Sequence, residues 1–241
     1  MTTTQLNARP YRDERDMDSI RALQVAGRAA NNGTYYVHRG DIDWWFYYPP
    51  SEDDRRANVR LWEDDGRLLA WCLHTPGEDA FDFFVHPSER GSERAQAMLR
   101  WGVDWATERA RIRDGVKLTN YWTSDTDAVT LAQWQACGFV ATPKPGGPIF
   151  MQSLERELEP PEVPDGFTVR DACTEADFRL RAEATHGAFG IERPWDAYWQ
   201  KNLGLFNSSA YVGENNLFVR SPDGRGAAAC MIWFDHVNKV G

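Results

Sequence analysis

A stretch that changes from strand to helix carries the residues best suited to bind an anion. The sequence FFVHPSERGSERAQAML, residues 83–99, begins as an apolar run and ends as a helix, with Arg90 and Gly91 between the two parts. Such a turn places unpaired main-chain N–H groups at a helix start, where they hold phosphate. The position that favours a second glycine is Glu93, so the pattern leaves open whether a phosphorylated cofactor still binds.

Acidic residues precede this turn on the same predicted strand. Asp79 and Asp82 lie in the segment DAFDFFVH, residues 79–86. Because side chains of a strand alternate between its two faces, Asp82 shares a face with Phe84, whereas Phe83 and its odd-numbered neighbours take the other face. His86 stands beside a proline and is a weaker candidate for chemistry than Asp82.

Other classes of enzyme have no support in the sequence. The chain has neither an H-E-x-x-H nor a G-x-S-x-G motif, which argues against a metalloprotease and a serine hydrolase. The four cysteines are far apart and form no C-x-x-C pair, so we expect free thiols and no metal site. They are Cys72, Cys137, Cys173 and Cys230.

The charge of the chain limits its partners. Its 241 residues carry a net charge of −9, which argues against a general nucleic-acid-binding protein, because such proteins need a basic face. The charge is compatible with a cationic small-molecule amine as substrate and equally with simple solubility. We expect no membrane segment and a cytoplasmic protein, since no long apolar window and no signal-like N-terminus are present.

The hydrophobic pattern predicts an α/β fold. A clear hairpin is expected at residues 58–75, because two apolar runs flank Asp65-Gly66, a strong turn dipeptide. Helices and strands are expected around it. They are a strand and helix within 9–30, a helix at 92–111, a strand at 115–125, a helix at 127–139 and a closing strand at 148–154.

The chain also contains a long internal repeat. GFTVRDACTEADF resembles the opening ARPYRDERDMDSI, and NLFVRSPDGRGAAACM resembles NVRLWEDDGRLLAWC. We therefore expect a first domain at residues 1–156, a proline-rich linker at 157–165 and the front part of a second copy at 166–241. The chain would then be a fragment of a longer protein. An open sheet edge in the second copy is compatible with a homodimer.

The order of these motifs resembles the GCN5-related N-acetyltransferase (GNAT) superfamily in a tandem form. The D-G hairpin, the DFFVHPSERGS strand and turn, and the LAQWQACGF helix end carry the resemblance. It implies a mixed, mostly antiparallel sheet flanked by helices, followed by a partial second copy. It also implies acetyl-CoA as co-substrate, with its pyrophosphate at the turn. The implied cofactor-binding residues are Phe84, Val85, Arg90, Gly91, Ser92, Glu93, Arg94 and Ala95.

Two positions depart from the family pattern. Glu93 replaces the usual glycine, and a carboxylate about 4 Å from a phosphate charge costs roughly 1 to 4 kcal/mol, depending on the dielectric. Glu93 could instead simply complement the positive end of the helix. Trp134 occupies the position of the usual tyrosine acid, and indole is not a general acid. Trp134 is explained more simply as a core residue.

The resemblance also implies catalytic and substrate-binding residues. Asp82 would be the general base, and Tyr121 or Ser124 could replace the missing acid. The aromatic stretch DWWFYYPP would form a wall for the amine. The implied substrate-binding residues are Trp44, Trp45 and Tyr47. Aromatic packing is the alternative, because RPWDAYWQ occupies the matching place in the second copy.

Two functions therefore remain open from the sequence. The first is an acetyl-CoA-dependent N-acetyltransferase that acts on a primary amine of a small molecule or an amino terminus. The second is a non-catalytic, degenerate module that binds a ligand or a partner domain. The sequence does not specify the acceptor, because a fold does not fix its chemistry.

Overall fold

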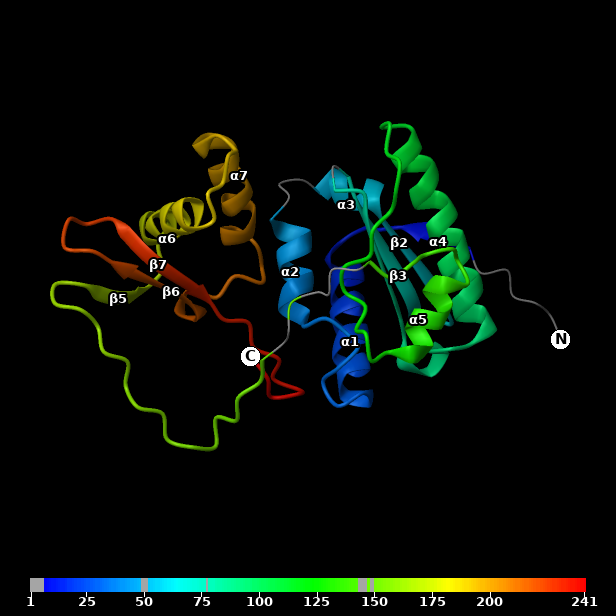
Figure 1. Ribbon diagram of the computed structural model, residues 1–241, viewed down its shortest axis with the longest axis horizontal. Helices are drawn as coiled ribbons and strands as arrows, with labels where there is room; N and C mark the ends of the chain where they lie inside the picture. The colour runs from blue at the N-terminus through cyan, green and yellow to red at the C-terminus, as the bar shows by residue number, and fades with distance from the viewer. Residues whose placement is uncertain (1–6, 49–51, 77, 143–146, 148–149) are drawn as a thin grey trace. The chain divides into compact units, whose positions relative to one another are not determined.

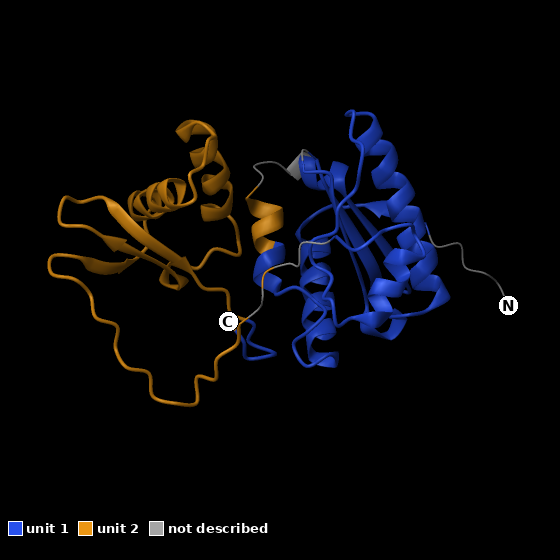
Figure 2. Ribbon diagram, viewed as in Figure 1, with its two compact units in different colours: residues 1–42, 51–144, 235–240 blue, residues 43–50, 145–234, 241 orange. Residues whose placement is uncertain are grey.

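The computed structural model describes residues 7–48, 52–76, 78–142, 147 and 150–241, which form two compact units. Unit 1 contains Met1–Ile42, Ser51–Lys144 and Asp235–Val240 (Figure 2). Unit 2 contains Asp43–Pro50, Pro145–Phe234 and Gly241. Each unit thus takes in a short segment from the other half of the chain. The expected boundaries, 1–156 and 166–241, did not include this exchange.

Unit 1 is built on a four-stranded antiparallel sheet in the order β1-β2-β3-β4 (Figure 1). The strands are β1 (Arg9–Pro10), β2 (Val59–Asp64), β3 (Arg67–Thr75) and β4 (Ala80–Val85). The helices are α1 (Glu14–Ala30), α2 (Arg39–Tyr47), α3 (Glu52–Asn58), α4 (Glu93–Arg111) and α5 (Ala128–Gln135), with a short 3-10 helix η1 (Pro87–Glu89). Helix α2 begins in unit 1 and ends in unit 2.

The predicted hairpin between β2 and β3 is confirmed. Asp65 and Gly66 have φ values of 48° and 74°, the left-handed conformation that a tight two-residue turn of this type requires at both positions. β3 is buried along nearly its whole length, from Leu68 to His74. The local turn signal therefore places a fully buried strand at the centre of the sheet.

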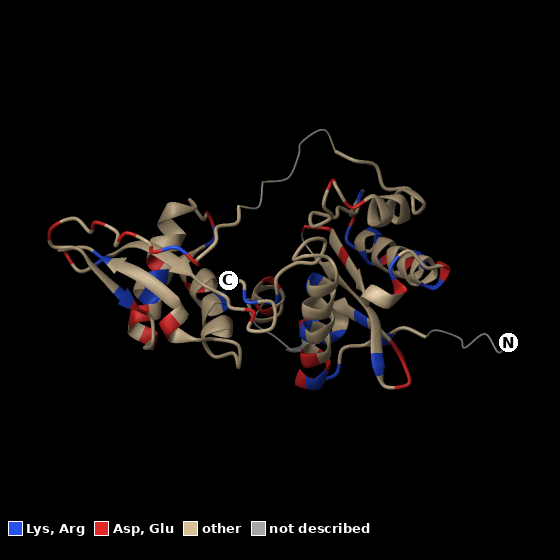
Figure 3. Cartoon of the chain, turned by 90° about the horizontal axis from the view of Figure 1, so that it is seen from below, with Lys and Arg blue, Asp and Glu red and all other residues tan. Residues whose placement is uncertain are grey.

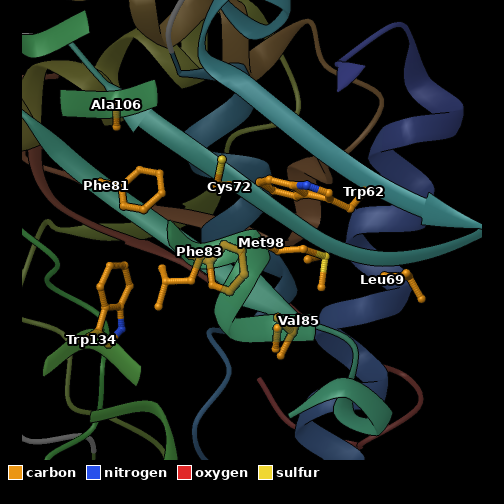
Figure 4. Packing of buried hydrophobic residues seen from close by; sticks show 12 residues of the cluster. Trp62, Leu69, Cys72, Phe81, Phe83, Val85, Met98, Ala106 and Trp134 are labelled. Carbon is orange, nitrogen blue, oxygen red and sulfur yellow. The ribbon is translucent and has the colours of Figure 1, made fainter. Parts of the chain in front are cut away.

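The two faces of β4 have different roles. Its odd-numbered residues Phe81, Phe83 and Val85 join the core under α4 and α5, together with residues such as Met98 and Trp134 (Figure 4). The even-numbered residues face the other way. On that face, Phe84 stacks on Trp71, with ring centroids 5.3 Å apart, and lies 6.2 Å from the Tyr36 ring. Asp82 therefore shares its face with aromatic rings, as the alternation predicts.

The strand expected at residues 115–125 does not form as such. A single parallel bridge joins Thr119 to Ala80, and the chain then leaves the sheet. The closing strand expected at 148–154 is also not observed among its described residues, which have no regular structure from Phe150 to Leu154. Residues 148–149 lie outside the described residues.

Unit 2 contains a smaller antiparallel sheet in the order β5-β6-β7. Its strands are β5 (Thr168–Asp171), β6 (Asn216–Arg220) and β7 (Gly226–Met231), with helices α6 (Glu175–Ala188) and α7 (Trp195–Phe206) and the 3-10 helix η2 (Gly213–Asn215). Thr174 caps α6, accepting the Asp177 N–H at 3.2 Å. The strand, helix and hairpin that the repeat predicted are therefore present, in the predicted order.

No helix among the described residues is long and apolar enough to cross a membrane. The described parts of the chain also contain no group of three or more His, Cys, Asp or Glu residues arranged to hold a metal ion. Basic and acidic residues are interspersed on the helices of both units (Figure 3).

Candidate active site

A cleft lies in unit 1 where β4 and the segment after Thr119 separate. The two segments pair through two hydrogen bonds of 2.9 Å: the Thr119 N–H donates to Asp79 O, and the Phe81 N–H donates to Thr119 O. Beyond these bonds the two segments diverge, and they enclose a space of about 450 Å³, part of which is open to solvent. The cleft is lined by Tyr35, Tyr36, Phe83, Phe84, Val85, Arg90, Asn120, Trp122, Thr123, Asp127, Thr130 and Gln133.

The edge of β4 presents main-chain groups to this cleft. Bonding groups of an antiparallel strand point alternately to its two neighbours. The Phe81 N–H donates to Thr119 O and the His86 N–H donates to Leu69 O. The main-chain N–H and C=O groups of the odd-numbered residues of β4 therefore point away from β3. Phe83 and Val85 therefore direct their N–H groups toward the cleft. A ligand with amide or carbonyl groups can pair there as a further strand would.

The turn after β4 has the features of an anion site. Gly91 adopts a φ of 77°, and Ser92 caps α4 by accepting the Ala95 N–H at 3.0 Å. Within the described residues, the N–H groups of Gly91, Glu93 and Arg94 donate to no other protein group. Unpaired donors at the positive end of a 19-residue helix suit a phosphate group.

The side chain of Arg90, however, already has an anionic partner. Its guanidinium forms a short ion pair with Asp127 and lies 4.8 Å from the centre of the Tyr35 ring. Asp127 is only 2% exposed, and it caps α5 by accepting the Thr130 N–H at 3.0 Å. The positive charge that the resemblance assigned to pyrophosphate binding is thus paired with the buried carboxylate of Asp127, which also lines the cleft.

Glu93 does not neutralise either neighbouring arginine. It is exposed at the first position of α4, whereas Arg94 pairs with Asp64 at 2.7 Å and lies 3.8 Å from Glu89. An acid at this position is favoured by the helix dipole. Of the eight residues that the resemblance assigned to cofactor binding, Phe84, Val85 and Arg90 line the cleft. Gly91 and its neighbours contribute main-chain donors beside it.

Asp82 is buried next to Phe83 and Phe84 of β4, which line the cleft, but does not itself line it. It is 3% exposed, and Asn120 Nδ2 donates to its Oδ1 at 3.1 Å. Burial, with a smaller contribution from Glu78, raises the pKa of Asp82 to about 7. A carboxyl group with this pKa is suited to accept a proton near neutral pH.

The remaining predicted residues lie elsewhere. Tyr121 is 59% exposed and Ser124 bonds to Thr126 within a turn, at 2.9 Å; neither lines the cleft. Trp134 packs edge-on against Phe81, 5.8 Å away, which confirms it as a core residue.

The aromatic residues predicted to form a wall for the amine pack against other residues of unit 2. Trp44 stacks on Tyr48, with centroids 4.4 Å apart, and Tyr47 lies 3.4 Å from Ser209 through its hydroxyl group. These contacts belong to unit 2, and neither Trp44, Trp45 nor Tyr47 lines the cleft. The packing interpretation of this stretch accounts for the observed contacts.

The sequence interpretation missed most residues of the cleft, and Tyr36, Asn120 and Asp127 are three of them. Tyr36 donates its hydroxyl to Val85 O at 2.7 Å, and Gly27 makes room for its ring, since a Cβ there would lie 2.3 Å from it. Asn120 and Asp127 were also missed. An N-cap signal, Asp before an apolar helix, could have identified Asp127, but nothing local marked Tyr36 or Asn120.

Comparison with known proteins supports the fold. No family model matches the chain, and no curated protein matches it in sequence. A GCN5-related N-acetyltransferase from Sphaerobacter thermophilus is similar in structure, with 19% identity and a TM-score of 0.54 over 96% of this chain and 72% of that chain. A tandem GNAT protein from the clavulanic acid biosynthesis pathway matches with 16% identity and a TM-score of 0.51, over 93% of this chain and 73% of the other. The chain therefore has the fold of the GCN5-related N-acetyltransferases.

Proposed function

We propose that unit 1 is an acetyl-CoA-dependent N-acetyltransferase domain that acts on a primary amine. The observation that carries the proposal is the cleft along the open edge of β4, which Arg90 lines, followed in the chain by the unpaired N–H groups of Gly91, Glu93 and Arg94 at the start of α4. The edge suits the amide groups of pantetheine, and the turn suits a pyrophosphate. Bound acetyl-CoA would supply the acetyl group, whose C–S bond breaks as a C–N bond to the amine forms.

The residues of the chain would handle the proton and the charge. Asp82, whose pKa lies near 7, would remove a proton from the ammonium group of the acceptor, directly or through water, and so form the neutral amine that attacks the thioester. The Phe83 and Val85 N–H groups, which face the cleft, would donate to oxygen atoms of the ligand. The net charge of −9 favours a cationic acceptor. A small molecule or an amino terminus meets this requirement.

Calorimetry with acetyl-CoA and with CoA tests the binding step. We expect micromolar binding that weakens at least tenfold in Arg90→Ala, because a charge at the diphosphate is lost. Arg94→Ala is the matched control: Arg94 lies four residues later, in the first turn of α4. Its side chain pairs with Asp64 and does not line the cleft, so affinity should stay within twofold. Equal affinity of both variants would contradict the proposed location.

Asp82→Asn tests the chemical step separately. We expect a loss of about 100-fold or more in kcat with a panel of primary amines, because the general base is removed, and little change in acetyl-CoA affinity. Unchanged turnover across pH 6 to 9 would show that Asp82 is not the base.

One observation favours a second function, a non-catalytic ligand-binding module. The Arg90 guanidinium is already neutralised by buried Asp127, which would compete with a diphosphate. Asp127→Asn separates the two functions, because asparagine still caps a helix while the competing charge is gone. A transferase should bind acetyl-CoA more tightly in this variant. No binding by either protein at millimolar ligand would leave only the non-catalytic module.

A further inference from the structure

Asn120 stands at the point where the pairing with β4 stops. In a continuing parallel ladder, the Tyr121 N–H would donate to Phe81 O, two residues beyond Thr119. Phe81 O instead accepts the side-chain amide of Asn120, at 3.1 Å. The side chain thus takes the place of the next main-chain bond, and the segment after it is free to leave the sheet.

The same amide group reaches Asp82. Asn120 Nδ2 donates to Asp82 Oδ1 at 3.1 Å as well as to Phe81 O. Its own Oδ1 accepts the Thr123 hydroxyl at 2.6 Å. Because a hydroxyl donates to Oδ1, the NH₂ group must point toward β4, so Thr123 fixes the orientation of the amide. Asn120 and Thr123 both line the cleft.

We infer that Asn120 is a positioning residue, which ends the β4 pairing to open the cleft and orients the buried carboxylate of Asp82 behind the residues that line it. The inference deepens the proposed function and rests on it for the role of Asp82. The hydrogen bonds of Asn120 to Phe81, Asp82 and Thr123 do not depend on which reaction the protein catalyses. Donation from Asn120 favours the charged form of Asp82 and opposes the effect of burial.

The titration of Asp82 tests the inference without activity. Carboxyl-carbon NMR of aspartate-labelled protein would follow Asp82, identified by loss of its signal in Asp82→Asn. We expect Asn120→Leu to raise the pKa of Asp82 by about one unit, the effect of a hydrogen bond to a charged group. Gln133→Leu is the control: it removes another amide that lines the cleft, whose Nε2 has no hydrogen-bond partner among the described residues, and it should leave this titration unchanged.

Thr123→Val provides a second, milder variant if Asn120→Leu does not fold. It keeps the amide but removes the hydroxyl that orients it, so we expect a smaller shift of the Asp82 titration in the same direction. An unshifted Asp82 in the folded variants would overturn the inference. In an active enzyme, the acidic limb of the kcat/KM profile should move with the NMR titration, which a merely structural role of Asn120 would not produce.

The outcomes also separate this inference from the proposed function. If the protein binds no acetyl-CoA but Asp82 shifts in Asn120→Leu, the transferase proposal fails and the positioning role of Asn120 stands. If acetyl-CoA binds and Asp82 titrates normally in both variants, the positioning role fails alone. Amide exchange gives a further readout: the Phe83 N–H should become more protected in Asn120→Ala if the ladder extends and the cleft closes.

Discussion

The two D-G hairpins of the chain begin alike and end in different surroundings. Cys72 and Cys230 each lie six positions after the turn glycine, Gly66 or Gly224. β3 is almost entirely buried, between β2 and β4. β7 is largely exposed and, among the described strands, pairs only with β6.

The difference shows what a further strand after the hairpin, and the helix that follows it, add to the sheet. β4 and α4 cover β3, provide the core of unit 1 and create the cleft at the end of their own connection. Unit 2 has no such pair among its described elements. The cleft therefore lies in unit 1, although both units share the same opening motif.

Thiol labelling should give the largest contrast between the hairpins. Cys230 is exposed and Cys72 is fully buried, and burial raises the pKa of the Cys72 thiol. We expect Cys230 to react at least about 1,000-fold faster, equivalent to about 4 kcal/mol of protection. Peptide mapping after timed alkylation measures both rates in one sample. Similar rates would show that β3 is as accessible as β7.

A core truncation should be the next largest effect. Leu69→Ala removes a fully buried side chain of β3, so we expect a loss of about 2 to 5 kcal/mol in the free energy of unfolding. The matched change in β7 is Ala227→Gly, at an exposed site with the same offset from the turn, where about 0.5 to 1 kcal/mol is expected. Urea unfolding followed by circular dichroism compares the two; equal losses would contradict the contrast.

The burial of Asp82 should make unit 1 less stable in alkaline solution. Its folded pKa of about 7 exceeds its unfolded value, so the folded state prefers the protonated form, and stability falls as pH rises from about 4 through 7. Asp82→Asn should therefore stabilise the protein at pH 8, by on the order of 2 kcal/mol, and have little effect at pH 4. Asp171→Asn, on the exposed strand β5, should change stability by less than about 0.5 kcal/mol at either pH.

Arg181 allows a finer comparison of buried cations. In unit 1, Arg90 pairs with Asp127. In unit 2, Arg181 is 5% exposed, contacts the Asn202 amide oxygen at 3.5 Å and leaves its Nε without a partner. Burial lowers the pKa of Arg181. Arg181→Met should thus be neutral or stabilising by about 1 kcal/mol, as thermal unfolding would show. A loss of several kcal/mol would reveal an anionic partner.

Local signals were sufficient for the framework of the fold. The Asp65-Gly66 turn, the strand before His86 and the amphipathic helix after Ser92 are specified by neighbouring residues, and the structure confirms each. The repeat likewise predicted the hairpin of unit 2. These elements depend on turn chemistry and periodicity, which a sequence shows directly.

The site depended on long-range contacts, which a sequence does not show. Residues 115–125 have a strand-like composition, but the bond from Asn120 to Phe81 ends the pairing, across 39 positions. The ion pair of Arg90 with Asp127 spans 37 positions. Tyr36 follows a polar loop without periodicity. Asp82 was selected correctly as a strand residue beside the turn, whereas its catalytic role stays a prediction.

The short terminal segment assigned to unit 1 has a consequence for protein engineering. Asn238 Nδ2 donates to Val25 O of α1 at 3.1 Å, and Asp235 accepts the Asn238 amide at 2.7 Å. A protein of residues 1–156 alone would lack the segment 235–240, which contacts α1. A protein of residues 166–241 would contain that segment without α1. A design that moves unit 1 into another scaffold should therefore add residues 235–240 back, through a designed linker or a circular permutation.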